Sequence, residues 1–301
     1  VRIIDGNHLP ASDKRLGPLR GFVGAALPGQ SLVVYDPDLD MIVDLVPCED
    51  GHAQERSLMS PILESAQSGQ LWIADRNFCT RAILTGWHEG GSAFIVREHG
   101  ANPNPTEQGP LRKMGRVDTG VVYEQAVSIE DSQGNVLMLR RIEVRLKQPT
   151  EDGDTVIRLL TNLSNEELGV REIAQLYRKR WKIEAMFGRL ESVLNSEISS
   201  LGHPRAALLA FGIAALAYNV LAVIGTAVKH QHQLDDAKLQ LSAYFIAMEI
   251  KAHYAGMMIA IALGVWEPFD QMTPAQLSRT LLKIAVHANP RALRQHPRAP
   301  K

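Results

Sequence analysis

Short apolar runs, turn residues and helical patterns alternate over the first third of the chain. Residues 1–4 (VRII) form a short, mainly apolar run before Asp5, after which Gly6 and Asn7 mark a turn, a pattern typical of the end of a strand. The β-rich runs 31–35 and 41–46 predict a hairpin, because Asp, Pro and Asp stand between them. The same segment then predicts a helix at 54–67, a strand at 71–74, a helix at 78–87 and a strand at 92–96. Strands that alternate with helices in this way predict an α/β layer.

After Arg97 the pattern changes to longer alternating runs. A loop rich in Pro, Asn and Gly opens this segment, and residues 117–129 and 136–147 then alternate on either side of turn residues 131–135. Alternation of this kind is typical of antiparallel strands with one solvated face. We therefore expect an inserted antiparallel β-subdomain.

The rest of the chain is helical in pattern. A long helix is expected at 166–195, with Ser164 or Asn165 as its N-cap, and two further helices at 205–229 and 235–263. Residues 206–228 carry no charge and are long enough to span a bilayer. Because this run is rich in Ala and includes polar residues, we interpret it as a buried core helix and expect no membrane partner.

The composition is that of a globular protein with no overall basic character. Hydrophobic residues make up 45% and charged residues 22%, which excludes a disordered or fibrous chain. The 32 Lys and Arg residues balance 33 Asp and Glu residues, so any nucleic-acid site must rest on a local basic patch. Cys48 and Cys79 form no disulfide framework or zinc motif, which favours a reducing compartment, the cytoplasm.

Asp5 and Asp75 are the first candidates for chemistry. Each follows an apolar strand-like run and precedes a turn signal, in the sequences IID-GN and WIAD-RN. If the two strands are neighbours, both carboxylates project from the same edge of the sheet. That edge is where open α/β sheets place their sites.

A third acidic candidate lies in the long helical segment. Tyr177, Arg180, Glu184 and Glu191 follow one another at intervals of three, four and seven residues. On a helix of 3.6 residues per turn these positions share one broad face, so Tyr177, Arg180 and Glu184 would point toward the same place. Trp181 lies away from that face and is interpreted as a core residue.

Three carboxylates that converge at a sheet edge suit Mg²⁺ or Mn²⁺, which prefer hard oxygen ligands. Two such ions can hold the attacking and leaving oxygens of a phosphoryl transfer. Between Val170 and Glu191 there are six basic residues and three acidic ones. These cations would contact a phosphodiester backbone, and the candidates are Arg76, Arg180, Lys182 and Arg189.

This arrangement resembles the DDE transposases of the insertion-sequence-four type, which are bacterial cut-and-paste elements. The resemblance rests on VRIIDGNHL around Asp5, IADRNF around Asp75, and YRKRWKIEAMF, which carries the Tyr-x2-Arg-x3-Glu part of the YREK signature. It implies an RNase H-like core in which Asp5, Asp75 and Glu184 bind two divalent ions. It also implies cleavage of transposon ends and strand transfer into target DNA, with Tyr177 and Arg180 as phosphate contacts.

The resemblance also implies a domain order. We expect the first part of the core at 1–97, the β-rich insertion at 98–162, the catalytic and following helices at 163–228, and a helical region with a basic tail at 229–301. It implies an enzyme that works on double-stranded DNA as a dimer and is associated with the bacterial nucleoid.

Two departures from the family pattern leave alternatives open. Glu191 stands where the signature has Lys, and an acidic side chain cannot contact phosphate as Lys does, so Arg189 or Lys182 would take that role. Asp5 lies near the first residue of this sequence, so we expect that an N-terminal DNA-binding part is missing. A related nuclease without transposition and an inactive DNA-binding remnant are the alternative functions.

Overall fold

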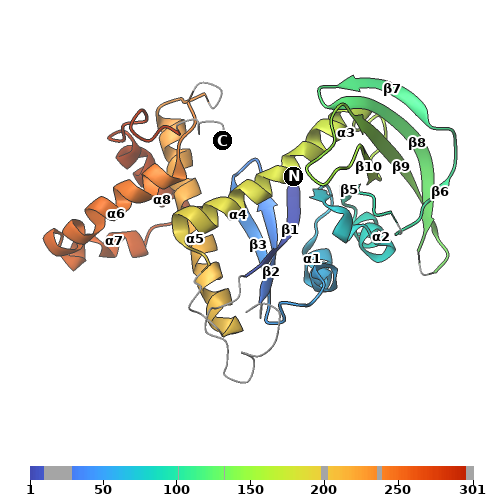
Figure 1. Cartoon of the computed structure of the whole chain (residues 1–301). Helices are drawn as coiled ribbons and strands as arrows, with labels where there is room; N and C mark the ends of the chain where they lie inside the picture. Colours follow the sequence, from blue (N-terminus) through green and yellow to red (C-terminus); the bar gives the residue numbers. More distant parts are fainter. Residues whose placement is uncertain (10–28, 101, 132, 198–202, 236–238, 296–301) are drawn as a thin grey trace. The chain divides into compact units, whose positions relative to one another are not determined.

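The computed structural model describes residues 1–9, 29–100, 102–131, 133–197, 203–235 and 239–295. The chain forms two compact units, one of Val1–Gly188 with Glu197–Gly212 and one of Arg189–Ser196 with Ile213–Lys301. Figure 1 shows the elements of each unit. The end of the predicted basic tail, residues 296–301, lies outside the described residues.

A ten-stranded sheet organises the first unit, with the order β3-β2-β1-β4-β5-β10-β9-β8-β6 and with β7 paired to β8. The parallel pairs are β1 with β4 and β4 with β5, and the other pairs are antiparallel. The predicted α/β class is confirmed as a mixed fold with a large, mostly antiparallel sheet. The strands are β1 (Arg2–His8), β2 (Gln30–Asp36), β3 (Met41–Cys48), β4 (Leu71–Ala74), β5 (Ala93–Arg97), β6 (Thr106–Glu107), β7 (Arg112–Val117), β8 (Gly120–Glu130), β9 (Val136–Leu146) and β10 (Val156–Thr161).

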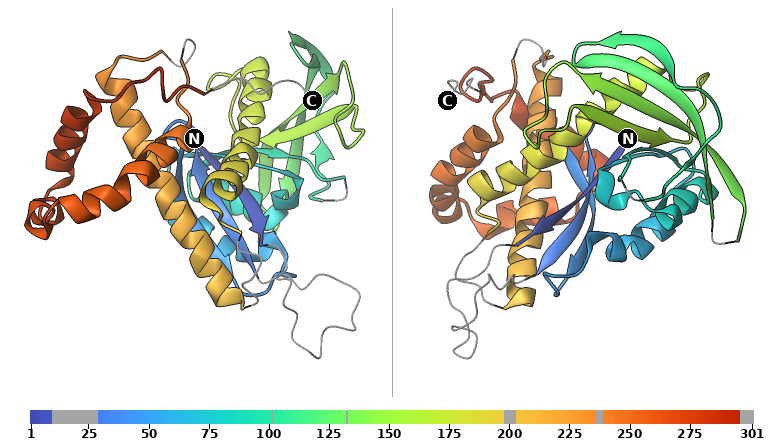
Figure 2. Two further views of the ribbon diagram at one scale, coloured as in Figure 1. Left: turned by 60° about the vertical axis from the view of Figure 1, so that its left-hand side comes forward. Right: turned by 45° about the vertical axis from the view of Figure 1, so that its right-hand side comes forward.

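Two helices cover one face of the strands β1, β4 and β5, as both views of Figure 2 show. They are α1 (Met59–Ser65), preceded by the 3₁₀ helix η2 (Glu55–Leu58), and α2 (Arg81–Glu89), preceded by η3 (Arg76–Phe78). Ile4, Trp72 and Ala74 on the strands belong to one buried cluster with Ile62 of α1 and Trp87 of α2. Side chains alternate along a strand, so Ile3 and Asp5 point to the opposite face.

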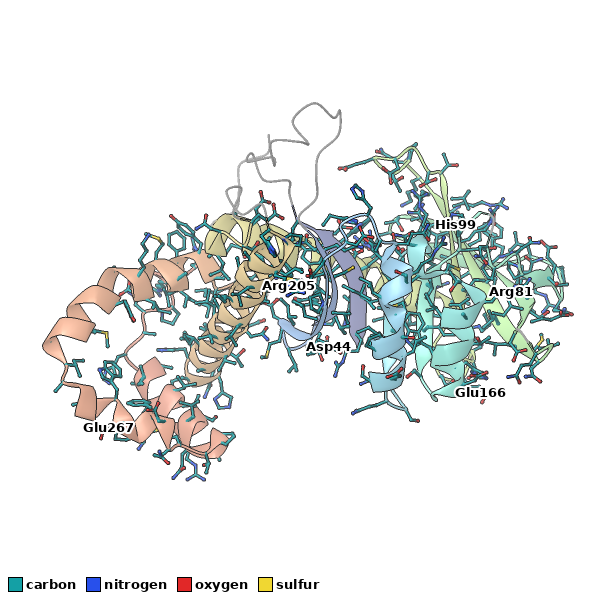
Figure 3. All side chains as sticks on the ribbon, turned by 90° about the horizontal axis from the view of Figure 1, so that it is seen from below. Asp44, Arg81, His99, Glu166, Arg205 and Glu267 are labelled. Atoms are coloured by element: carbon teal, nitrogen blue, oxygen red, sulfur yellow. The ribbon has the colours of Figure 1, made fainter. Side chains whose placement is uncertain are left out.

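Helix α2 is also tied to the far end of the sheet. Arg81, labelled in Figure 3, lies at the first position of α2. Its guanidinium donates to the carbonyl of Pro103 at 3.2 Å and to that of Glu130, the last residue of β8, at 3.4 Å. The covering helices and the long strands therefore form one packed unit.

The strands of the predicted insertion continue the same sheet. The alternating runs form β8 and β9, and β7 pairs with β8 as an additional strand. Strand β10 pairs with both β9 and β5. The 98–162 segment therefore shares a hydrogen-bonded edge with the first segment of the chain.

The predicted end of the first strand is wrong. Asp5 lies in the middle of β1, which continues to His8, because β2 pairs with every residue from Ile3 to His8. Only the pairing with β4 stops early, at Ile3 and Ile73. The turn signal at Gly6 and Asn7 thus marks the end of one ladder and not the end of the strand.

The predicted long helix begins later than expected and is interrupted. Ser164 and Glu167 exchange hydrogen bonds between their backbone N–H groups and side chains, at 2.7 and 3.2 Å, which closes a separate turn. The helix starts only after Gly169, as α3 (Val170–Tyr177), tightens to the 3₁₀ helix η4 (Arg178–Arg180), and continues as α4 (Trp181–Leu194).

The uncharged run forms α5 (Pro204–Gln231), but it is not buried on every side as predicted. Phe211 and Tyr218 are buried, whereas Leu209 and Leu216 are each 66% exposed. Within the described residues, α5 is the one helix long and apolar enough to cross a membrane, and 39% of its most apolar window is buried. Such a helix is weak evidence for a span, because core helices of soluble proteins share these properties.

The second unit also holds shorter helices. The predicted helix 235–263 is shorter, as α6 (Ala243–Ala260), because the hydroxyl of Ser242 caps it by accepting from the Phe245 N–H at 3.5 Å. It is followed by η5 (Leu263–Val265), α7 (Glu267–Asp270) and α8 (Pro274–Ala285).

Candidate active site

Asp5 and Asp75 lie just beyond the paired residues of two neighbouring parallel strands. Strand β1 pairs with β4 through Arg2 with Trp72 and Ile3 with Ile73. Asp5 and Asp75 each come two residues after the last of these pairs, and the charge of Asp75 acts on Asp5. Asp75 directly follows β4, and its side chain caps η3 by accepting from the Asn77 N–H at 2.7 Å. The sheet therefore brings these two carboxylates near one another at one end of the β1–β4 ladder.

Arg180 brings Glu184 to the same place. Its guanidinium contacts the Asp5 carboxylate at 3.2 Å and the Glu184 carboxylate at 2.6 Å. The pair with Glu184 spans one helical turn, whereas the pair with Asp5 joins residues 175 positions apart. Asp5 and Glu184 thus share one guanidinium, on the face of the sheet opposite α1 and α2.

Tyr177 completes this cluster from the last turn of α3. The side chain is buried, and burial raises the pKa of its phenol above the ordinary value. It also hydrogen-bonds to Arg180. Although burial lowers the pKa of Arg180, the neighbouring Tyr177, Asp5 and Glu184 raise it above its ordinary value. Arg180 is therefore a permanent cation at the centre of the site.

The negative charge at the site is only partly compensated. Burial, together with the nearby carboxylate of Asp75, raises the pKa of Asp5 to about 7, against the opposing effect of Arg180. Burial of Asp5 is the first cause of this raised pKa, and the nearby carboxylates of Asp75 and Glu55 add to it.

The three carboxylates have the donor chemistry for a hard divalent ion. In the described part of the chain, however, no three His, Cys, Asp or Glu side chains stand ready to hold a metal ion. The Arg180 guanidinium contacts both Asp5 and Glu184. An ion held by both of these carboxylates would have to displace that guanidinium.

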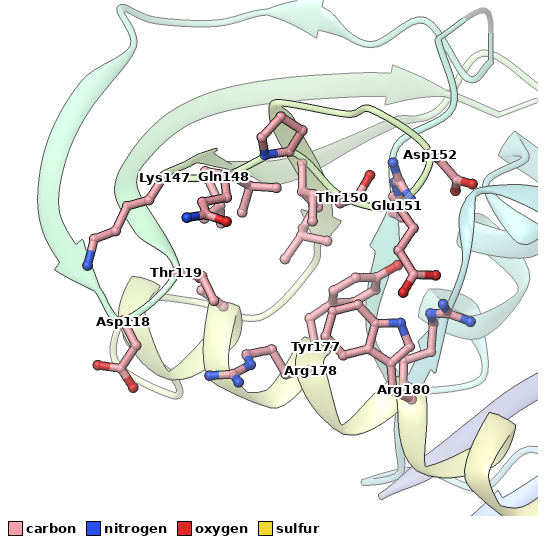
Figure 4. A pocket seen from close by; sticks show the side chains of 18 of the residues that line it. Asp118, Thr119, Lys147, Gln148, Thr150, Glu151, Asp152, Tyr177, Arg178 and Arg180 are labelled. Atoms are coloured by element: carbon pink, nitrogen blue, oxygen red, sulfur yellow. The ribbon is translucent and has the colours of Figure 1, made fainter. Parts of the chain in front are cut away.

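A cleft of about 860 Å³ opens beside Glu184. Figure 4 shows Tyr177, Arg178 and Arg180 on the helical side of this cleft, and Thr150, Glu151 and Asp152 on the loop across from them. Trp181 also lines the cleft and is 52% exposed, so its interpretation as a core residue is wrong. The switch from the 3₁₀ helix to α4 at this residue leaves the indole at the surface.

The other predicted phosphate contacts are more scattered. Arg76 is exposed at the start of η3. Lys182 donates to the carbonyl of Pro37 at 3.1 Å. Arg189 belongs to the second unit, where its guanidinium lies over the ring of Tyr218, 5.2 Å from the centroid. None of these three contacts brings the side chain to Asp5 or Glu184.

Two polar residues at the site carry no sequence signal that singles them out. Arg97, the last residue of β5, lines the cleft and forms an ion pair with Asp154 at 2.5 Å. Glu55, the first residue of η2, lies against Gly6, the neighbour of Asp5. Gly6 was interpreted only as a turn signal, although a glycine within a strand can also mark a close approach of another group.

Comparison with known proteins identifies a family for this chain. The family described as Transposase DDE domain matches residues 1–220. A protein of Sinorhizobium fredii (strain NBRC 101917 / NGR234) named "Putative transposase y4zB" is 28% identical over 229 residues, or 74% of this chain. The match covers 60% of that protein, so the chain spans about three fifths of the length of this relative.

Proposed function

The chain belongs to the transposase DDE domain family, and from this premise we propose that it is a DNA transposase with Asp5, Asp75 and Glu184 as its catalytic carboxylates. The observation that carries the proposal is the meeting of these residues. Asp5 and Asp75 follow the last paired residues of two adjacent parallel strands, and Asp5 and Glu184 contact the same guanidinium. Contacts that link residues from three distant parts of the chain support this assignment.

We further propose that the core is RNase H-like and that the chain is of the insertion-sequence-four type. The strand order β3-β2-β1-β4-β5, antiparallel in its first half and parallel in its second, supports the first point. The Tyr177, Arg180 and Glu184 cluster supports the second. In this scheme the core comprises 1–97 and 163–228, the segment 98–162 is inserted, and 229–301 is the C-terminal helical region.

The reaction proposed is hydrolysis of a phosphodiester at a transposon end, followed by attack of the freed 3′-hydroxyl on target DNA. Two Mg²⁺ or Mn²⁺ ions would activate the attacking oxygen and stabilise the leaving one. Asp5, Asp75 and Glu184 are the residues that would hold them, because carboxylate oxygens are the preferred ligands of such ions.

Positively charged groups would bind and orient the DNA. Arg180 and Tyr177 would contact the phosphate beside the scissile bond, and the planar guanidinium suits two phosphate oxygens. Arg76, Lys182 and Arg189 would contact the backbone further away. Two copies would act on double-stranded DNA at the nucleoid, in the cytoplasm.

Replacing the carboxylates tests the proposal. We expect Asp75→Asn and Glu184→Gln each to lower Mg²⁺-dependent cleavage of DNA by more than about a hundredfold, because loss of a ligand exceeds the 10–100-fold cost of disturbing its surroundings. Glu166→Gln, the same change at an exposed residue outside the helices, should cleave like the wild type. Circular dichroism would show whether each variant keeps its fold.

The outcomes separate the alternatives. Cleavage that survives in either folded variant contradicts the assignment. Cleavage without joining of ends to target DNA favours a nuclease. DNA binding without cleavage by the wild type favours an inactive remnant, for which Glu191 in place of the signature Lys is the motivating observation.

A further inference from the structure

Glu55 reaches the candidate active site from the face of the sheet opposite Glu184. Asp5 points to the face where Arg180 meets it. The next residue, Gly6, faces the other way. A Cβ atom at Gly6 would lie 2.0 Å from Glu55 Oε1, so the Glu55 carboxylate occupies the space that a side chain would need. Glycine at position 6 is what allows Glu55 to lie against the backbone of β1.

Asn77 joins Glu55 to the second aspartate. Its side-chain amide donates to Glu55 Oε2 at 2.7 Å, and its backbone N–H donates to Asp75 Oδ1 at 2.7 Å. This junction lies beyond Ile3 and Ile73, where the pairing of β1 with β4 ends. One residue thus fixes both carboxylates at the open edge of the ladder.

The charge of Glu55 has little compensation from the protein. The side chain is 13% exposed, and its ion-pair partner within the described residues is His8, at 3.8 Å. No Lys or Arg in that part of the chain forms an ion pair with it. A mostly buried carboxylate without a firm cationic partner is costly, and a cation bound close by would remove that cost.

We infer that Glu55 is a fourth acidic residue of the active site, a positioning residue that strengthens the binding of a divalent cation at Asp5 and Asp75. It acts by adding negative charge beside Gly6 and by fixing Asp75 through Asn77. The inference rests on the proposed function, because the cation is implied by the family. It also explains why Gly follows Asp5 and why Asn stands two residues after Asp75.

Calorimetric titration of the full chain with Mn²⁺ alone tests this role without any measurement of activity. We expect Glu55→Gln to weaken Mn²⁺ affinity by about tenfold, which is the lower end of the loss in metal affinity seen when a group that orients metal ligands is removed. Glu64→Gln, the same change at an exposed position of α1, should bind like the wild type. Asp75→Asn should lose most of the binding, because it removes a proposed ligand.

A second variant moves the Glu55 carboxylate but keeps its charge. In Gly6→Ala the new methyl group collides with the end of the Glu55 side chain, which must swing away. We expect Mn²⁺ affinity to fall in this variant as well. Thermal unfolding without metal provides the folding control, because the side-chain oxygen that Glu55→Gln retains would still accept from the Asn77 amide.

The titrations distinguish the failure of this inference from that of the proposed function. If Asp75→Asn loses Mn²⁺ while Glu55→Gln and Gly6→Ala bind within twofold of the wild type, the role of Glu55 is refuted and the carboxylate site stands. If the wild type binds no Mn²⁺, or if Asp75→Asn leaves binding unchanged, both are refuted. If Glu55→Gln does not fold, the Mn²⁺ affinity of Gly6→Ala decides whether Glu55 has this role.

Discussion

At the scale of single residues, Arg180 determines the state of the site. Its guanidinium contacts Asp5 and Glu184 and hydrogen-bonds with Tyr177. It therefore neutralises the carboxylates that would otherwise repel one another. The same guanidinium is the group proposed to bind phosphate. Arg180 cannot contact both carboxylates fully and also receive a phosphate, so binding of cations and DNA would release it from the acids.

Removing this guanidinium should have opposite effects on the two ligands. We expect Arg180→Gln to bind Mn²⁺ more tightly, by about tenfold or 1.4 kcal/mol, because the cation no longer competes with a fixed positive charge. DNA should bind more weakly. Calorimetry with Mn²⁺ and fluorescence anisotropy with a DNA duplex would measure the two changes.

A matched control is Arg116→Gln, which removes an exposed Arg from β7. Its Mn²⁺ affinity should equal that of the wild type. Equal or weaker Mn²⁺ binding by Arg180→Gln would mean that Arg180 does not compete for the carboxylates.

At the scale of elements, the hairpin of β2 and β3 shows how a short segment is fixed. The Asp36 carboxylate accepts from the backbone N–H groups of Asp38 at 2.9 Å and Leu39 at 3.1 Å, and it pairs with Arg2 on β1. Burial opposes ionisation of Asp36, but these donors and Arg2 lower its pKa below the ordinary value. One side chain thus closes the turn and ties the hairpin to β1, the strand that carries Asp5.

This pKa predicts a pH-dependent contribution to stability. A carboxylate with a lowered folded-state pKa stabilises the protein above its unfolded pKa, and the contribution disappears as pH falls through the folded value. We expect Asp36→Asn to lower the free energy of unfolding at pH 7 by about 1–3 kcal/mol. The difference from the wild type should shrink below about pH 4. Urea unfolding at several pH values measures it, and a difference independent of pH would contradict the prediction.

At the scale of the whole molecule, positive and negative charges are balanced in number but unevenly distributed. The net charge is −1, while η4 consists of three consecutive basic residues, Arg178, Lys179 and Arg180. Lys179 pairs with Asp38 and Arg180 with acids of the site, whereas Arg178 is exposed and lines the cleft. The cleft therefore exposes a cation although the chain as a whole has a net charge of −1, and we expect the proposed DNA substrate to contact it.

The salt dependence of DNA binding should report this local cation. Each phosphate contact adds about 0.9 to the slope of log affinity against log salt concentration. We expect Arg178→Gln to reduce that slope by about one such contact and to weaken binding of all DNA sequences alike. Arg56→Gln, at an exposed position of η2 on the other face of the sheet, is the control. An unchanged slope in Arg178→Gln would remove this residue from the DNA contacts.

Local patterns in the sequence predicted much of the first unit. Asp36-Pro37-Asp38 predicted the hairpin that the structure shows, and the run at 71–74 is β4. The helix start was missed because Gly169 does not look like a cap, and because the Ser164 signal serves a separate turn. The prediction that Trp181 is a core residue was wrong, because the preceding 3₁₀ segment changes the direction of side chains along the helix.

The sequence by itself determined the contacts between residues that are close along the chain. The spacing of Arg180 and Glu184 sets their ion pair, because one helical turn separates them. Only the tertiary structure decided that Arg180 meets Asp5, 175 residues away, and that Glu55 lies over Gly6. Such contacts depend on the order of the strands, on their pairing register and on which face of the sheet each side chain occupies. These features result from the packing of all residues of the unit together, so no local pattern in the sequence reveals them.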